Sequence, residues 1–186
     1  MKKTIALMSS PRIESNTDIL TDKIIEGVKS NGTNVEVEKV NLVDYQSYVC
    51  RGCGQCRPTG NCEQYSEVNS VLQKIKEGDG MIIGTPTWWM GPSSQLKIFM
   101  DHFGAYLAPD YSSRIAGKRC VIVACNGNAE VNFAEQVCKN VADILGFLQV
   151  NVKSSLGLKG LIDKGAAAKH TDMLDKAFNM GRELYS

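Results

Sequence analysis

The segment SSPRIESNT, residues 9–17, gathers hydrogen-bond donors directly after a short apolar run at residues 4–8. A helix is predicted to begin near Asn16, and the free N–H groups and the dipole of a helix N-terminus favour an anion. Plain helix capping is the alternative, because Ser15 and Asp18 have the spacing of a capping box. The side chains that would surround an anion here are Ser9, Ser10, Arg12, Ser15, Asn16 and Thr17.

Two later segments place flat or polar groups at the ends of predicted buried strands. In GTPTWWMGPSS, residues 84–94, the adjacent Trp88 and Trp89 point to opposite sides, so one faces a crevice or a partner unless both pack in the core. In ACNGN, residues 124–128, the backbone around Asn126 and Gly127 either bonds the edge of a planar heterocycle or forms a plain turn. Taken with the first segment, they fit a ligand with a phosphate at one end and a flat ring at the other, and FMN fits best.

Four of the seven cysteines lie within CRGCGQCRPTGNC, residues 50–62, with the spacing C-x2-C-x2-C-x5-C. The first three spacings match a compact run that holds iron–sulfur clusters, and the glycines within it allow a tight backbone. Arg51 and Arg57 would offset the negative charge of a cluster. A zinc site and structural or redox-active thiols are the alternatives. The candidate metal ligands are Cys50, Cys53, Cys56 and Cys62, whereas Cys120, Cys125 and Cys138 are expected in the core.

The elements that must position these segments alternate between short apolar runs and amphipathic stretches. This alternation predicts an α/β fold with a doubly wound parallel sheet, and five strands favour the order 2-1-3-4-5 with a ligand crevice at the carboxyl ends of strands one and three. The whole chain, residues 1–186, is predicted to be one domain with a cysteine-rich loop at about 49–63. Predicted strands cover residues 4–8, 35–40, 80–84, 119–125 and 148–155, and predicted helices cover residues 16–30, 66–76, 93–107, 131–145 and 166–184.

The overall composition excludes several classes of protein. The net charge of +1 leaves no electrostatic footprint for nucleic acid or an anionic membrane, so neither is expected as a partner. The apolar run near the N-terminus is too short for a signal peptide and no run could span a bilayer, so we expect a cytoplasmic protein. The sequence also lacks a nucleoside-triphosphate loop, a G-x-S-x-G elbow and the C-x5-R motif of small phosphatases.

Three segments carry a family resemblance through their order and spacing: SSPRIESNT, GTPTWWMGPSSQLKIFMDH and AGKRCVIVACNG. Over nearly the whole chain, the sequence resembles the flavodoxin-like NAD(P)H-dependent FMN reductases. The resemblance implies a flavodoxin-like fold, and it implies that one helix terminus serves both capping and phosphate binding. The cysteine segment resembles that of the iron–sulfur flavoproteins of the same superfamily, which bind a [4Fe-4S] cluster beside FMN. The implied FMN-binding residues are Ser9, Arg12, Ser15, Asn16 and Thr17 at the phosphate, Pro86, Thr87, Trp88, Trp89, Met90 and Gly91 along the ring and ribityl chain, and Asn126 and Gly127 on the other side of the ring.

The expected function is an FMN-dependent oxidoreductase that accepts electrons from NAD(P)H or ferredoxin and passes them to a small-molecule acceptor. No side chain is assigned as a general acid or base, because a flavin carries the chemistry itself. The alternatives are an iron–sulfur flavoprotein that carries electrons through a [4Fe-4S] cluster and a non-enzymatic zinc or thiol redox-sensing module. A homodimer or homotetramer is expected, with Trp88, Trp89 and Tyr106 facing the partner copy. His102 is predicted to face solvent or an interface, and His170 is predicted to pack inward.

Overall fold

The computed structural model describes residues 1–32, 34–45 and 48–186. Its centre is a sheet in which five parallel strands follow the order β2-β1-β3-β5-β6. A sixth strand, the two-residue β4, pairs antiparallel with the end of β3. The expected five-strand order is therefore correct along the parallel path but misses β4. The strands are β1 (Lys2–Met8), β2 (Val35–Asn41), β3 (Gly80–Trp88), β4 (Gly91–Pro92), β5 (Arg119–Cys125) and β6 (Asn151–Leu158).

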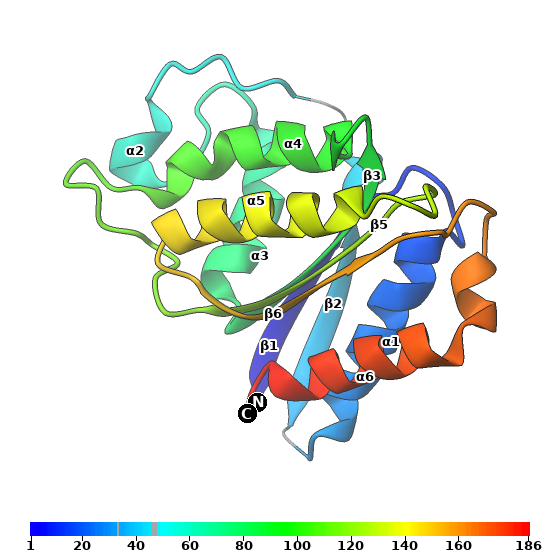
Figure 1. Cartoon of the computed structure of the whole chain (residues 1–186). Helices are drawn as coiled ribbons and strands as arrows, with labels where there is room; N and C mark the ends of the chain where they lie inside the picture. The colour runs from blue at the N-terminus through cyan, green and yellow to red at the C-terminus, as the bar shows by residue number, and fades with distance from the viewer. Residues whose placement is uncertain (33, 46–47) are drawn as a thin grey trace.

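Helices cover both faces of the sheet, as expected for parallel strands that are apolar on both sides (Figure 1). Helices α1 and α6 lie on one face, and α3, α4 and α5 lie on the other. The two termini lie close together at the end where the strands begin. The helices are α1 (Asn16–Ser30), α2 (Cys56–Thr59), α3 (Ser66–Glu77), α4 (Ser94–Met100), α5 (Phe133–Phe147) and α6 (Thr171–Glu183), with 3-10 turns η1 (Leu42–Asp44), η2 (Asp101–Tyr106) and η3 (Ala166–Lys169).

Two hydrophobic cores form because successive side chains of a strand point to opposite faces. In β1, Ile5 and Leu7 belong to the core beneath α3, α4 and α5, whereas Ala6 between them belongs to the core beneath α1 and α6. In β3, Met81 and Ile82 divide between the two cores in the same way. All five side chains are almost completely buried, so the sheet is the shared wall of both cores.

Helices α1 and α6 cross at two glycines, which brings their backbones into unusually close contact. A Cβ atom on Gly27 would stand 2.0 Å from the carbonyl oxygen of Phe178, and one on Gly181 would stand 2.1 Å from that of Ile24. The neighbour is backbone in both cases, so no side chain can move aside. This crossing fixes the position of α1, whose N-terminus reaches the candidate site.

Three expectations for single residues are wrong. Tyr106, expected at a partner surface, is fully buried. His102, expected to face solvent or an interface, is only 4% exposed and its Nε2 lies 2.6 Å from the carbonyl oxygen of Tyr48. His170, expected to pack inward, is exposed at the break between η3 and α6.

The predicted helix at 93–107 is divided into α4 and the 3-10 turn η2. In the part of the chain that the structure covers, no helix has both the length and the apolar character needed to cross a membrane.

Candidate functional site

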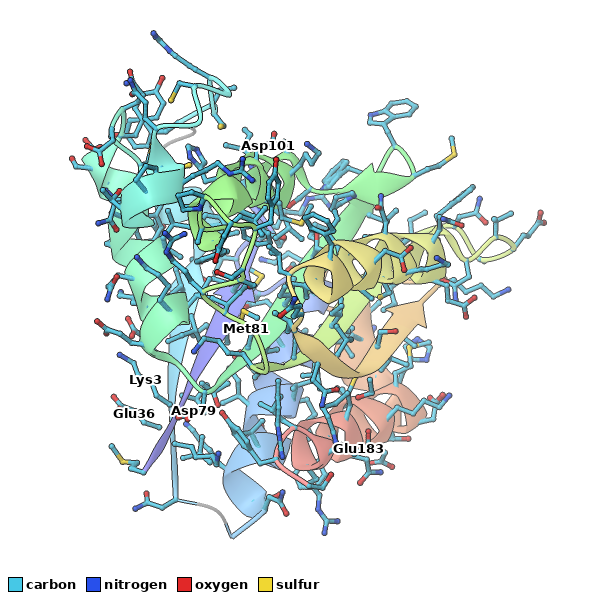
Figure 2. All side chains as sticks on the ribbon, turned by 90° about the vertical axis from the view of Figure 1, so that its left-hand side faces the viewer. Lys3, Glu36, Asp79, Met81, Asp101 and Glu183 are labelled. Carbon is cyan, nitrogen blue, oxygen red and sulfur yellow. The ribbon has the colours of Figure 1, made fainter. Side chains whose placement is uncertain are left out.

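A cavity of about 270 Å³ opens at the carboxyl ends of the strands. The loops that follow β1, β5 and β6 converge at this end (Figure 1). Figure 2 shows Lys3, Glu36 and Asp79 gathered at the opposite end, where the strands begin. Parallel α/β sheets bind ligands outside the carboxyl ends of their strands, which is where this cavity lies. The lining residues are Ser10, Arg12, Ser15, Asn16, Thr17, Pro86, Thr87, Trp88, Cys125, Asn126, Gly127, Leu161, Ile162 and Lys164.

One wall of the cavity is the N-terminus of α1. Ser15 caps the helix, because its hydroxyl accepts a hydrogen bond of 3.1 Å from the N–H of Asp18. The N–H groups of Asn16 and Thr17 come at the start of the helix, where no carbonyl of the same helix can accept from them. Arg12 is exposed at the rim, and its guanidinium carbon lies 5.2 Å from the ring centre of Trp88. Capping by Ser15 therefore leaves N–H groups at this terminus available to an anion.

The side chain of Asn16 does not point a free amide at the cavity. Its Nδ2 donates to the carbonyl oxygens of Leu161 at 3.0 Å and Asp163 at 2.8 Å, and its Oδ1 accepts from the N–H of Ala167 at 2.9 Å. All three partners belong to the segment between β6 and α6. Asn16 thus draws this segment onto the start of α1, where Leu161, Ile162 and Lys164 close the cavity.

Ser9 lies beneath the cavity rather than in its lining. Its buried hydroxyl donates to the carbonyl oxygen of Gly84 at 3.0 Å and lies 2.9 Å from the hydroxyl of Ser93. Ser93 also donates to the carbonyl oxygen of Ser9 and caps α4 by accepting from Leu96. In this geometry Ser9 ties β1 to β3 and α4, which holds the loop after β1 in place.

The turn from β3 to β4 divides the predicted aromatic segment. Pro86, Thr87 and Trp88 line the cavity, and Trp88 is 42% exposed. Trp89 is 94% exposed and Met90 is 62% exposed, and neither lines the cavity. Both adopt positive φ angles, 49° and 63°, because the tight hairpin back to β4 requires left-handed backbone there. Gly91, which begins β4, also lies outside the lining.

The hydroxyl of Thr87 is buried and has no hydrogen-bond partner among the residues that the structure describes. A buried hydroxyl without a partner is costly, and in natural proteins it calls for an explanation. Because Thr87 lines the cavity, a ligand bound there would lie next to this residue.

Asn126 and Cys125 form the far side of the cavity, where β5 ends. The amide of Asn126 is occupied within its own turn: Nδ2 donates to the carbonyl oxygens of Asn128 and Val131, and Oδ1 accepts from the N–H of Ala134. Burial raises the pKa of the Cys125 thiol, against the opposing effect of its hydrogen bond with Thr17. Cys125 is buried in the core beneath α1 and α6, as expected, and it also lines the cavity as a neutral thiol.

These observations fit a ligand like FMN. The start of α1 with Arg12 and Lys164 suits a phosphate, and the slot between Trp88 and the end of β5 suits a flat ring. Thr87, whose hydroxyl is unpartnered in the described structure, lies in the same lining.

A second, smaller hollow brings the four loop cysteines together. Cys50, Cys53, Cys56 and Cys62 all line it, with His102 beside them. Burial raises the pKa of the Cys56 thiol, and the other three cysteines raise it further. Among the described residues, no three His, Cys, Asp or Glu side chains stand close enough to share one metal ion. A [4Fe-4S] cluster binds each cysteine to a different iron, so it spreads its ligands more widely than a single zinc ion does.

The structure is a flavodoxin-like α/β fold with a cavity at the carboxyl ends of its parallel strands. Residues 2–159 match the family model described as NADPH-dependent FMN reductase, and the chain belongs to this family of FMN-dependent oxidoreductases.

Several relatives carry the name iron–sulfur flavoprotein. One, from Methanocaldococcus jannaschii, is 31% identical over 134 residues, which is 72% of this chain and 68% of that protein. One from Archaeoglobus fulgidus is 35% identical over 99 residues, 53% of this chain and 47% of that protein, so this chain spans about half of that relative. Among solved structures, the NAD(P)H:quinone oxidoreductase from Methanothermobacter marburgensis has a TM-score of 0.78 at 19% identity, over 99% of this chain and 96% of that one, which shows a shared fold.

Proposed function

We propose that the cavity at the strand ends binds FMN, and that the protein uses it to move electrons from NAD(P)H or ferredoxin to a small-molecule acceptor. The observation that carries the proposal is one continuous cavity that joins the N-terminus of α1 to the Thr87–Trp88 wall. When bound, FMN supplies a ring that takes up and releases one or two electrons.

The protein's own contribution is placement and electrostatics. The N–H groups at Asn16 and Thr17, with Ser10, Ser15 and Arg12, hold the phosphate, while Lys164 adds a second positive charge at the rim. The ring rests between Trp88 and the end of β5, and the polar groups of Asn126 keep that turn in shape. The family resemblance also implicated four residues that do not line the cavity: Ser9, Trp89, Met90 and Gly91. In this proposal they do not contact the cofactor directly but stabilise or extend the loops around it.

The direct test is purification without added flavin, followed by identification of the chromophore released on denaturation. We expect FMN at close to one per chain. Under anoxic conditions, the bleaching of flavin absorbance by NADPH, NADH and reduced ferredoxin is then compared. Absence of a flavin after incubation with excess FMN would contradict the site assignment, whereas bound FMN that none of the three donors reduces would contradict only the donor.

We further propose that Cys50, Cys53, Cys56 and Cys62 hold a [4Fe-4S] cluster, so that the protein acts as an iron–sulfur flavoprotein and electron carrier. The convergence of all four on one hollow supports the proposal. Iron and acid-labile sulfide are measured after anoxic reconstitution, in the natural chain and in Cys53→Ala. Cys138→Ala is the control, because this cysteine is buried in α5, away from the loop. We expect Cys53→Ala to lose iron and keep FMN. Stoichiometric zinc in the natural chain would overturn the cluster.

Finally, we propose a homodimer or homotetramer in which a second copy covers the cavity mouth. Ile13, Trp89, Met90 and Ile162 project large apolar side chains from three different loops around that mouth, and each is more than 60% exposed. Such a grouping of exposed apolar side chains marks an interaction surface. Light scattering on the natural chain and on Trp89→Ser tests the proposal: we expect the variant to shift toward the monomer, and a monomeric natural chain would contradict it.

A further inference from the structure

The second half of the cysteine loop is held from outside by Arg114, which follows η2. Its Nη2 donates to the carbonyl oxygens of Arg57 at 2.6 Å and Pro58 at 3.2 Å, and its Nη1 donates to that of Ala105 at 3.3 Å. The side chain also packs against Gly60, where a Cβ atom would stand 3.0 Å from the Arg114 side chain. The guanidinium therefore bridges α2 to the end of η2.

Lys76, near the end of α3, holds the next part of the same loop. Its Nζ donates to the carbonyl oxygen of Gly60 at 3.0 Å and to Oδ1 of Asn61 at 3.2 Å. Asn69, two turns earlier in α3, accepts from the N–H of Cys62 at 2.6 Å and donates to its carbonyl oxygen at 3.1 Å. Three side chains from outside the loop thus fix the segment that carries Cys56 and Cys62.

The first half of the loop is bound differently. Residues 51–55 are exposed, and Gly52 and Gly54 adopt positive φ angles of 65° and 72°. The N–H of Gly52 bonds to the Sγ of Cys50 within the same turn. The loop therefore combines a segment anchored by other elements with a glycine-rich segment that folds on itself.

The two anchoring cations are themselves an unusual arrangement. Lys76 is half-buried, and burial and the neighbouring charge of Arg114 both lower its pKa. Over residues 1–32, 34–45 and 48–186, neither side chain forms an ion pair with a carboxylate. By contrast, Lys74, two residues before Lys76 on the same helix, pairs with Glu38 at 2.6 Å. The two like charges repel each other. The carboxylates of Glu77, near Lys76, and Asp110, near Arg114, offset part of that repulsion without pairing with either cation, and a further anion beside them would offset more of it.

A cluster bound by four thiolates is such an anion. We propose that Lys76 and Arg114 are positioning residues for the cysteine loop: they anchor the half that carries Cys56 and Cys62, and their charges favour the reduced cluster. The inference rests on the proposed cluster. When the cluster takes up one electron its negative charge grows by one, so nearby positive charge stabilises the reduced form and raises the reduction potential.

The experiment compares Lys76→Met, Lys76→Arg and Arg114→Lys, with Lys74→Met as the matched control, in reconstituted protein that carries FMN. Lys74→Met removes the same charge from the same helix but leaves the loop contacts intact. The first readout is the ratio of reduced to oxidised cluster at a fixed redox potential of the solution, measured by electron paramagnetic resonance. We expect Lys76→Met to lower this ratio by about three- to tenfold. Lys76→Arg and the control should stay near the natural value.

The second readout separates anchoring from charge and requires no cluster. Amide hydrogen exchange at Gly60 and Cys62, in the metal-free chain, should be faster in Lys76→Met and in Arg114→Lys than in Lys74→Met. Arg114→Lys keeps the charge but loses the fork that spans two carbonyls, so its cluster ratio should stay within about twofold while exchange rises.

The outcomes distinguish the inference from the cluster proposal. If the natural chain reconstitutes a cluster and Lys76→Met matches Lys74→Met in both ratio and exchange, the role of Lys76 is overturned and the cluster stands. If the natural chain binds no iron and sulfide, the cluster proposal fails and takes the electrostatic role with it. A lower ratio in Lys76→Met that Lys76→Arg restores supports the inference.

Discussion

Replacement of Thr87 by valine should raise the stability of the flavin-free protein and at the same time weaken FMN binding. The Thr87 hydroxyl is buried without a partner in the described structure, yet the residue lines the cavity. Valine has nearly the same shape and removes the hydroxyl. The test is demanding because stability and FMN affinity should change in opposite directions, whereas general damage to the fold would lower both.

The magnitudes follow from the cost of unpaired polar groups. An unsatisfied buried hydroxyl costs about 1–3 kcal/mol, so its removal should stabilise the flavin-free chain by about 1–2 kcal/mol. For a chain of this size that corresponds to a rise in Tm of about 2–8 °C. A hydrogen bond from the hydroxyl to FMN contributes about 1 kcal/mol, and its loss should raise the Kd about fivefold.

Ser154 provides a control within the same chain. Its hydroxyl is also buried and unpartnered in the described residues, but Ser154 lies in β6 and does not line the cavity. Ser154→Ala should therefore raise the Tm without changing the Kd for FMN. Both quantities are measured by calorimetry on flavin-free protein and by fluorescence titration with FMN. If Thr87→Val leaves FMN affinity equal to that of Ser154→Ala, the Thr87 hydroxyl does not contact the cofactor.

Three further changes test other parts of the structure. Gly27→Ala should destabilise the chain by about 2 kcal/mol or more in urea, because its Cβ would overlap the backbone of α6; Gly146→Ala in α5, with open space around it, should instead stabilise by about 0.5–1 kcal/mol. Arg12→Ala should weaken FMN binding by about tenfold in a titration and leave the Tm of the flavin-free chain unchanged, since Arg12 precedes the helix and is exposed. In cluster-free protein treated with iodoacetamide at pH 8, mass spectrometry should show that the four loop cysteines are labelled before the buried Cys138. Burial raises the pKa of the Cys138 thiol to about 12. Labelling of Cys138 should therefore begin only as the pH approaches that value or the chain unfolds.

Much of the fold could be predicted because its signals are local. The apolar run at Arg119–Cys125 and the periodic stretch at Asn16–Ser30 coincide with β5 and α1. Strand β4 could not be predicted in this way, because two residues carry no periodic pattern. Its hairpin turn depends on left-handed backbone at Trp89 and Met90, a conformation that these residue types rarely adopt.

The two histidines show where local patterns fail. His102 was expected to face solvent or an interface, but the cysteine loop folds over it: the carbonyl of Tyr48 bonds the imidazole, and the ring of Tyr65 packs edge-on against it at 6.3 Å. His170 was placed on an inner face by extending one helix through residue 170, where the structure has a break instead. Each error comes from contacts or breaks that sequence spacing does not record.

The same reasoning explains which half of each site the sequence could indicate. The start of α1 and the cysteine spacing are local and were predicted, but the groups that complete both sites come from far along the chain. Asn16 bonds to Leu161 across 145 residues and so brings in Lys164, and Arg114 reaches Arg57 across 57 residues. In both proposals the short motif indicates the type of ligand, whereas Lys164, Lys76 and Arg114, which would adjust its affinity or reduction potential, reach the site through tertiary contacts. Substitutions at Lys164, Lys76 and Arg114 should therefore change the properties of bound groups without changing which groups bind.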